Sequence, residues 1–122
     1  VFIDFTGHGC VNCREMEQNV FANETIKSKF QKEFIFVSLY ADDKTELSAD
    51  KQLIGSDGKL KTTIGDYIAD LQLRKFNSNA RPQYVIIDAE GNMLTKETRF
   101  HNLDIGAFQK FLEEGISNFK NK

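Results

Sequence analysis

The sequence lacks several features that mark specialised classes of protein. It contains no tryptophan, one proline and two cysteines in 122 residues. A single proline excludes a collagen-like or proline-rich chain, and two cysteines are too few for the disulfide framework of a small secreted protein. No apolar run approaches the roughly 20 residues that a membrane-spanning helix requires. The 16 basic and 18 acidic residues are mixed along the chain, so nothing favours nucleic acid or an anionic membrane as a partner.

The sequence does contain the material for one hydrophobic core. Hydrophobic residues make up 40% of the chain and charged residues 28%, and eleven phenylalanines supply large apolar side chains. These values are typical of a single globular domain. The chain opens directly on the β-prone segment 1–5, so we expect residues 1–122 to be one domain cut from a longer polypeptide. The lack of a visible targeting segment therefore does not indicate a cellular location.

The first forty residues predict a strand, a helical region and a second strand. Residues 1–5 are apolar and β-prone, and apolar residues recur at helical spacing between residues 10 and 32. Asn23 interrupts this region as the expected N-cap of a second helix. Residues 34–40 are almost continuously apolar, which is typical of a strand covered on both faces. The two strands are therefore expected to be parallel and joined by a right-handed crossover.

A polar segment follows and leads into another helix. Residues 42–62 carry many charges and predict a solvated insertion with a turn at residues 56–58. Its interpretation as a spacer is favoured over that of a loop specific for a partner. Thr63 and Asp66 form the pattern of a capping box, which begins a helix that ends near Phe76.

The last third of the chain predicts a hairpin and a final helix. Residues 84–88 and 93–100 are expected to form two antiparallel strands joined by a turn at residues 89–92. Asp104 is the expected N-cap of a helix with an apolar stripe. The fold class is therefore α/β, with a central mixed β-sheet flanked by helices and a polar insertion at about 42–62.

The two cysteines fall where the first strand meets the following helix, as Cys10-Val11-Asn12-Cys13. A bridge that closes so short a loop removes little chain entropy, so it is a poor structural staple and indicates reactivity. Residues i and i+3 of a first helical turn are close enough to bridge. The free amide groups at a helix start favour a thiolate, so we expect Cys10 to be the exposed nucleophile. Cys13, one turn deeper, would be the resolving thiol.

Two other interpretations of the cysteine pair stay open. A Cys-x-x-Cys pair can be half of a zinc site, with His8 and His101 as possible further ligands. The spacing from Cys13 to His101 fits no zinc-finger pattern, which disfavours that interpretation. Both cysteines can also be unreactive core residues, although their place at a strand-to-helix turn argues against it. A binding module with structural or zinc-binding cysteines is thus the alternative to a redox domain.

The arrangement of these motifs resembles the thioredoxin superfamily. The resemblance rests on Asp4-Phe5, on the Cys-x-x-Cys motif four residues later, and on the lone Pro82 ahead of the predicted hairpin. The stretch from Val1 to Glu17, with Phe21 further on, is more similar to one branch, the C-terminal periplasmic domain of DsbD-type thiol:disulfide interchange proteins, also called cytochrome c biogenesis proteins. The general resemblance covers most of the chain outside residues 42–62. It implies a thioredoxin-like fold.

The resemblance also implies roles for four further residues. Asp4 would be the buried acid beneath the thiols, with a pKa raised by burial, and could accept the proton of Cys13. Glu17, on the same helix face as Cys13, would be a second acid that tunes the reactive thiol. The Arg81–Pro82 peptide bond would be cis and face the thiols. Arg81 would then offer its backbone groups to the substrate in strand-like pairing.

The function implied is that of a thiol–disulfide oxidoreductase that relays two electrons as a reductant. In the DsbD branch a membrane domain reduces the disulfide, and the dithiol then reduces an exported partner or an apocytochrome c maturation protein in the periplasm. The reaction needs no organic cofactor or metal, and we expect a monomeric domain. A stand-alone thioredoxin-like reductase is the alternative enzyme.

Some residues depart from the pattern of the superfamily. Gly9 stands where many members have tryptophan before the first cysteine, and Val11-Asn12 replaces the Gly-Pro of common thioredoxins. His8-Gly9 therefore gives a smaller and more flexible approach to Cys10, and the partner surface of other members is not expected to carry over. Arg14 could add positive potential near the thiols, but as a surface charge it needs no such role.

Overall fold

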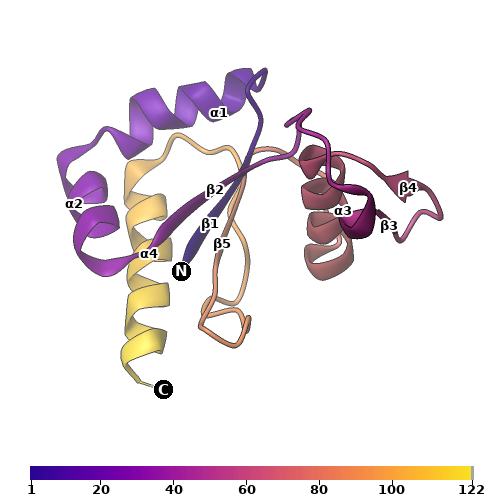
Figure 1. The fold of residues 1–122 in the computed structure, drawn as a ribbon. Coiled ribbons are helices and arrows are strands. Elements are labelled where there is room, and N and C mark those ends of the chain that lie inside the picture. The colour runs from indigo at the N-terminus through magenta and orange to yellow at the C-terminus, as the bar shows by residue number, and fades with distance from the viewer. Residues whose placement is uncertain (122) are drawn as a thin grey trace.

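A mixed three-stranded sheet forms the centre of the molecule. The computed structural model describes residues 1–121. In this sheet β1 (Phe2–Thr6) lies between β2 (Phe36–Tyr40) and β5 (Gln83–Ile86). β1 pairs with β2 in parallel and with β5 antiparallel. The predicted mixed sheet and the parallel pairing of the first two strands are confirmed (Figure 1).

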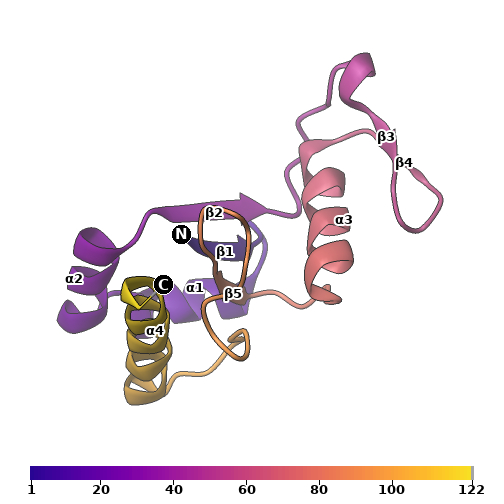
Figure 2. The same cartoon turned by 90° about the horizontal axis from the view of Figure 1, so that it is seen from below.

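Helices cover both faces of the sheet. α1 (Val11–Met16) continues directly into the π-helix η1 (Glu17–Phe21), and α2 (Glu24–Glu33) follows. The side chain of Asn23 accepts hydrogen bonds from the first turn of α2, which confirms the predicted interruption. α3 (Ile64–Phe76) lies on the opposite side of the sheet from α2 and α4 (Ile105–Lys120) (Figure 2).

Alternation along β1 divides the apolar side chains between two cores. Phe2 faces the larger core, together with residues of α1, η1, α2, β5 and α4. Phe5, three residues later, faces the smaller core beneath α3 with Ile68 and Val85. Phe2 is fully buried, and its ring lies 4.9–6.4 Å from six other aromatic rings, those of Phe21, Phe30, Phe34, Phe36, Tyr84 and Phe108. The high phenylalanine content therefore builds one aromatic core against β1.

β2 is less covered than its apolar sequence predicts. It is an edge strand that pairs only with β1 among the described strands. Its residues are half-buried or exposed, and 38% of Phe36 is accessible to solvent. The expectation of a strand covered on both faces is therefore wrong. A continuous apolar run does not distinguish an edge strand from a central one.

The predicted strand at residues 93–100 is also wrong. Only isolated bridges connect this segment to the rest of the sheet, between Ile87 and Met93 and between Tyr84 and Arg99. Between them the chain leaves the sheet, because Thr95 donates to the carbonyl of Glu97 in a local turn. The backbone returns in the antiparallel direction, but its pairing is interrupted in the middle.

The polar segment forms an arm beyond the end of β2. The 3₁₀ turn η2 (Ala49–Lys51) is followed by β3 (Leu53–Ile54) and β4 (Leu60–Lys61), which pair antiparallel. Gly58 has a φ of 80°, in the region that favours glycine, so the predicted turn forms. Figure 2 shows this arm projecting away from the sheet on the side of α3.

One glycine of α4 is required by close packing on the sheet. A Cβ atom added at Gly115 would lie 2.7 Å from Cδ1 and 2.9 Å from Cγ2 of Ile86, which is fully buried. Alanine is favoured over glycine in a helix by about 1 kcal/mol, but forcing an extra carbon into a packed core costs about 1–3 kcal/mol.

We expect Gly115→Ala to lower the free energy of unfolding in urea denaturation. The matched control is Gly106→Ala in the same helix, where the nearest atom would be at 3.4 Å. That control should be neutral or stabilising, and equal stability of the two variants would contradict the packing argument.

Candidate active site

The two cysteines lie at the end of β1, where the chain turns into α1. The amide of Cys10 donates to the carbonyl of Gly7 at 3.2 Å, which closes the turn after the strand. Cys10 is the N-cap of α1, and its sulfur accepts the amide hydrogen of Cys13 at 3.1 Å. The two residues form a disulfide with their Cα atoms 5.2 Å apart. The predicted proximity of the two thiols is therefore confirmed.

The two cysteine residues differ in exposure. Cys10 is half-buried at the start of the helix, whereas Cys13 is only 1% exposed. The first turn of α1 contains no acidic residue, and Cys10 lies at its N-terminus. Unpaired amides at a helix start favour an anion over a neutral group. Cys10 is therefore the more accessible of the two cysteines and lies at a helix start, whereas Cys13 is buried.

Asp4 is a buried acid on the strand that leads to the thiols. It is 4% exposed, and its Oδ1 accepts no hydrogen bond from the described residues. Burial, with a smaller contribution from the charge of Glu17, raises its pKa to about 7, although the guanidinium of Arg14 opposes the shift. The pKa of Asp4 therefore lies near neutral pH, and its role as proton acceptor stays a prediction.

Arg14 connects Glu17 to the end of β1. Its Nη2 donates to Glu17 Oε2 at 2.9 Å and to the hydroxyl of Thr6 at 3.1 Å. This second bond crosses from α1 to the last residue of the strand that holds Asp4. From the sequence, Arg14 was expected to be a surface charge. Its i,i+3 spacing from Glu17 was the signal that indicated a pair.

The Arg81–Pro82 peptide bond is cis, as the resemblance implied. Pro82 is buried and Arg81 half-buried, and burial lowers the pKa of the guanidinium of Arg81 while Asp42 opposes this shift. Two buried glutamines, Gln72 and Gln83, support the loop before Pro82 from the side of α3. Gln72 of α3 donates to the carbonyl of Ala80 at 2.8 Å and to the side chain of Gln83 at 2.7 Å.

No motif in the sequence indicated these glutamines or Asp42 as residues of the site. Gln83 in turn donates to the hydroxyl of Thr98 at 3.0 Å. Glutamine within a helix or strand carries no sequence signal for a buried network. Asp42 was assigned to the solvated insertion, but its carboxylate accepts hydrogen bonds from the backbone of His8 and Gly9, directly before Cys10.

The side chains of His8 and His101 make contacts other than with the two cysteines. The ring of His8 stacks on Tyr40, and His101 hydrogen-bonds to Glu15 at 2.8 Å. Within residues 1–121, no group of three or more histidine, cysteine, aspartate or glutamate side chains is placed to hold a metal ion. The residues named for the zinc alternative are therefore engaged elsewhere.

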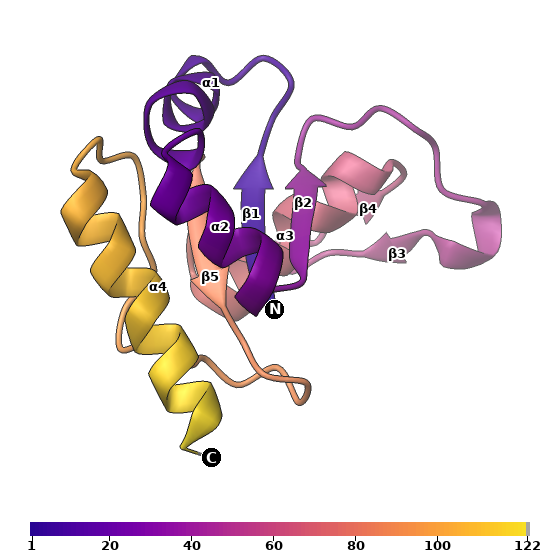
Figure 3. The ribbon, with the colours of Figure 1, turned by 90° about the vertical axis from the view of Figure 1, so that its left-hand side faces the viewer.

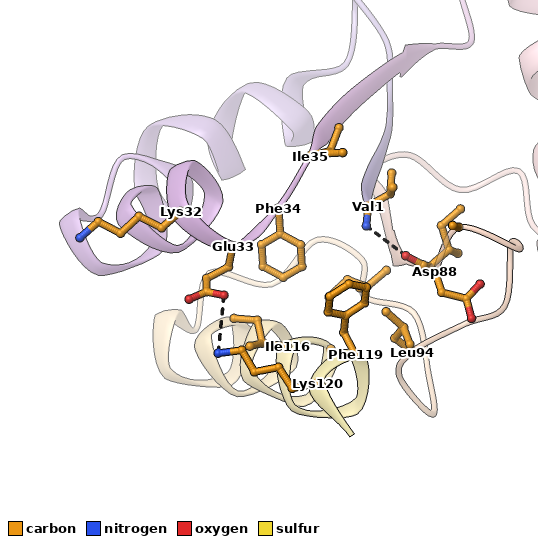
Figure 4. Close-up of a pocket in the computed structure, with 14 residues that line it drawn as sticks. Val1, Lys32, Glu33, Phe34, Ile35, Asp88, Leu94, Ile116, Phe119 and Lys120 are labelled. Atoms are coloured by element: carbon orange, nitrogen blue, oxygen red, sulfur yellow. Dashed lines mark hydrogen bonds and ion pairs between the residues drawn. The ribbon is translucent and has the colours of Figure 1, made fainter. Parts of the chain in front are cut away.

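An apolar hollow lies at the opposite end of β1 from the thiols. Its volume is about 560 Å³, and it is bounded by Val1, Phe34 and Ile35 on one side and by Ile116 and Phe119 of α4 on the other (Figure 4). Because β1 runs from this hollow towards Cys10, the hollow is separated from the thiols by the length of the strand. It takes no part in the candidate active site.

Comparison with known families matches residues 1–104 to the thioredoxin-like domain family. The match spans most of the chain, so the chain belongs to this family. Family membership and the Cys10–Cys13 disulfide together support a thiol–disulfide oxidoreductase.

Two solved structures share the fold. One is described as a DsbH oxidoreductase, with a TM-score of 0.66 and 16% identity over 95% of this chain and 71% of that one. The other is a thioredoxin from Thermus thermophilus, with a TM-score of 0.60 and 16% identity over 93% and 70% of the two chains. At this identity the likeness shows the fold alone. No curated protein sequence gave a match. None of the helices within residues 1–121 has the length and apolar character needed to cross a membrane.

The raised pKa of Asp4 predicts a pH-dependent stability. An aspartate in an unfolded chain titrates near 3.9, at about 3 pH units below the folded value. The folded state therefore retains the proton that the unfolded chain has lost, and the free energy of unfolding falls as pH rises from about 4 to about 7. Asp4→Asn removes the ionisable carboxyl, so the fall in the free energy of unfolding that Asp4 causes is absent from the variant. We expect the variant to exceed the wild type by about 2–4 kcal/mol in urea denaturation near pH 8.

The gain should shrink towards pH 4, where the carboxyl of the wild type is neutral. Asp50→Asn, in the exposed η2 turn of the arm, makes the same charge change and is the control. A gain of equal size at both pH values would show that the charge of Asp4 is not its cause.

Proposed function

We propose that this thioredoxin-like domain is a thiol–disulfide oxidoreductase that acts as a reductant through Cys10 and Cys13. The observation that carries the proposal is the disulfide at the junction of β1 and α1, with a half-buried Cys10 at the helix start and a buried Cys13 beneath it. This arrangement gives one sulfur that a partner can reach and one that can finish the exchange.

The exchange transfers two electrons in two steps. The thiolate of Cys10 attacks one sulfur of a partner disulfide, and a mixed disulfide forms between Cys10 and the partner. The S–S bond of the partner breaks, and its other sulfur leaves and takes up a proton. Cys13 then loses its proton and attacks the sulfur of Cys10. The second partner sulfur leaves and is protonated, so the partner ends as a dithiol. The domain ends with the Cys10–Cys13 disulfide seen in the structure.

Asp4 is proposed as the acceptor of the proton of Cys13. A base works best when its pKa lies near the working pH, and burial brings the pKa of Asp4 to about 7. Glu17 supports this role because its charge raises the pKa of Asp4. Arg14 holds the carboxylate of Glu17 at 2.9 Å, which keeps that charge in place.

The Arg81–Pro82 loop is proposed to bind the substrate backbone next to the thiols. Pro82 has no amide hydrogen to offer, so the carbonyl and amide of Arg81 are the groups available for strand-like pairing with an extended peptide. The side chains of Gln72 and Gln83 hold the loop from the side of α3. Partner affinity is therefore expected to come from main-chain contacts.

Within the family we propose a place in the DsbD-type branch. The support is the resemblance of residues 1–21, which include Asp4, both cysteines and Glu17. A membrane domain would then reduce the disulfide, and an exported protein would accept the electrons in the periplasm. A stand-alone thioredoxin-like reductase is the alternative. A DsbD-type membrane donor should reduce the domain in a reconstituted assay, whereas thioredoxin reductase with NADPH should reduce it if the alternative holds.

Replacement of Cys13 by serine tests the assignment of the two thiols. The variant can form the mixed disulfide but cannot resolve it, so we expect Cys13→Ser to accumulate a covalent adduct with a disulfide-bonded protein substrate. The adduct is measured by non-reducing electrophoresis and by mass spectrometry of the Cys10 peptide. Cys10→Ser is the matched control and should form little adduct, because Cys13 is buried. Equal trapping by both variants would overturn the roles given to the two thiols.

Replacement of Asp4 by asparagine tests its role as proton acceptor. We expect Asp4→Asn to slow reduction of a protein disulfide near pH 7 by about tenfold or more, because the base for Cys13 is lost. Stopped-flow measurements at several pH values should show that the difference narrows above about pH 9, where thiols ionise without help. An unchanged rate near pH 7 would make Asp4 a structural residue only.

A further inference from the structure

Asp42 holds the loop that presents Cys10. Asp42 lies two residues after β2, and its Oδ1 accepts a hydrogen bond from the amide of His8 at 2.9 Å. Its Oδ2 accepts one from the amide of Gly9 at 3.1 Å. Because Gly9 directly precedes Cys10, these bonds tie the nucleophile's loop to a segment more than 30 residues away in the sequence.

Two further contacts fix the same loop. The ring of His8 stacks on that of Tyr40, with centroids 4.1 Å apart and an angle of 14° between the planes. A Cβ atom at Gly7 would lie 3.2 Å from Oδ2 of Asp42, so the backbone there passes close to the carboxylate. The loop is therefore fixed by three contacts. The ring of His8 stacks on Tyr40, the amides of His8 and Gly9 bond to Asp42, and the backbone at Gly7 packs against the same carboxylate.

The carboxylate of Asp42 is charged at neutral pH. The amides of His8 and Gly9 stabilise its anionic form, and they hold its pKa below the usual range. The two amides are thereby occupied and are not free to stabilise an anion at Cys10. Asp42 also places a negative charge on the amide of the residue directly before Cys10, and a negative charge close to a thiol disfavours its thiolate.

Other titratable and charged groups lie on the elements packed around this loop. Asp42 interacts electrostatically with His8, Asp43 and Arg81. Asp4 on β1 interacts with Glu17 and Arg14 of α1 and η1. Asp43 differs from Asp42 in what it binds, because its Oδ1 accepts the amide of Thr45 at 2.8 Å within its own turn. Asp43 thus offers the same charge without the bonds to the loop.

We propose that Asp42 is a positioning residue for Cys10, which fixes the loop in front of the nucleophile and restrains its thiolate. The inference rests on the proposed function. Asp42 is the first residue of the polar segment 42–62, so this segment would contribute to the reaction at Cys10. The aspartate sets how readily Cys10 ionises and where a partner disulfide approaches it.

The first test is the pH dependence of alkylation of Cys10 in the reduced protein. Iodoacetamide labelling is followed by mass spectrometry of the Cys10 peptide. Asp42→Asn removes the charge and leaves one acceptor oxygen, so we expect the midpoint of labelling to fall by about half a pH unit, or about threefold more thiolate below the midpoint. Asp43→Asn is the matched control and should shift the midpoint by less than half as much. An unchanged midpoint in Asp42→Asn, or equal shifts in both variants, would overturn the proposal.

The second test reads the loop itself through amide hydrogen exchange measured by NMR. In the wild type the amides of His8 and Gly9 should be protected by Asp42. In Asp42→Asn they should exchange at least about tenfold faster, since a lost acceptor leaves an amide open to solvent. Gly7→Ala keeps the charge but pushes on the carboxylate, so it should also speed exchange. Unchanged exchange in both variants would contradict the positioning role.

Failure of this inference differs from failure of the proposed function. If wild-type Cys10 does not exchange with a protein disulfide, the proposed function is wrong and the role of Asp42 falls with it. If the wild type exchanges normally while Asp42→Asn keeps the wild-type midpoint, only the positioning role is wrong.

Discussion

The alternation of side chains along β1 is the constraint on which the rest of the structure depends. Phe2 and Asp4 face the helices of the larger core, while Ile3 and Phe5 face the side of α3. The strand then ends in the turn that carries Cys10. A slip of one residue in the pairing of β1 would exchange its two faces and remove Asp4 from beneath α1. Core and candidate site are therefore fixed by the same register.

This register places a costly acid next to the aromatic core. A buried carboxylate is unfavourable unless it is neutral or paired, and Oδ1 of Asp4 has no partner among the described residues. Tyr84 lies opposite Asp4 in the sheet, and burial together with the charge of Asp4 raises the pKa of its phenol. The six ring contacts of Phe2 show how tightly the neighbouring core is packed. Such packing can hold a destabilising group in place, and functional sites often carry one.

The sequence predicted the parts of the molecule that depend on local patterns. The start of α2 follows from Asn23, the proximity of the thiols from their spacing, and the turn at Gly58 from its residues. The errors concern contacts between distant segments. The exposure of β2 depends on which strands lie beside it. The segment after β5 bonds to α4 instead of continuing the sheet, because Glu114 accepts the amide of Lys96 and Asn118 donates to the carbonyl of Leu94.

Much of the candidate site was predicted, and its missing residues share one property. Asp4, both cysteines and the cis bond before Pro82 lie where the motifs indicated. Their roles stay predictions until the variants are measured. Arg14, Gln72 and Asp42 were not assigned a function, because each acts through a hydrogen bond to a backbone or side-chain group that the sequence does not pair with it. Side chains that support a site have no motif of their own.

The arm and α3 connect the loop before Cys10 with the loop that contains Pro82. On one side Asp42, at the start of the arm, holds the amides of the loop before the nucleophile. The arm is in turn fastened to α3, because the buried Asp70 accepts the amide and hydroxyl hydrogens of Ser56, both at 2.7 Å. Gln72, two residues further along α3, supports the loop of Pro82. Figure 3 shows how the arm leaves β2 and returns to α3 on one side of the sheet. The polar insertion is thus bonded at one end to the loop that carries Cys10 and, through α3, to the loop proposed to bind the substrate.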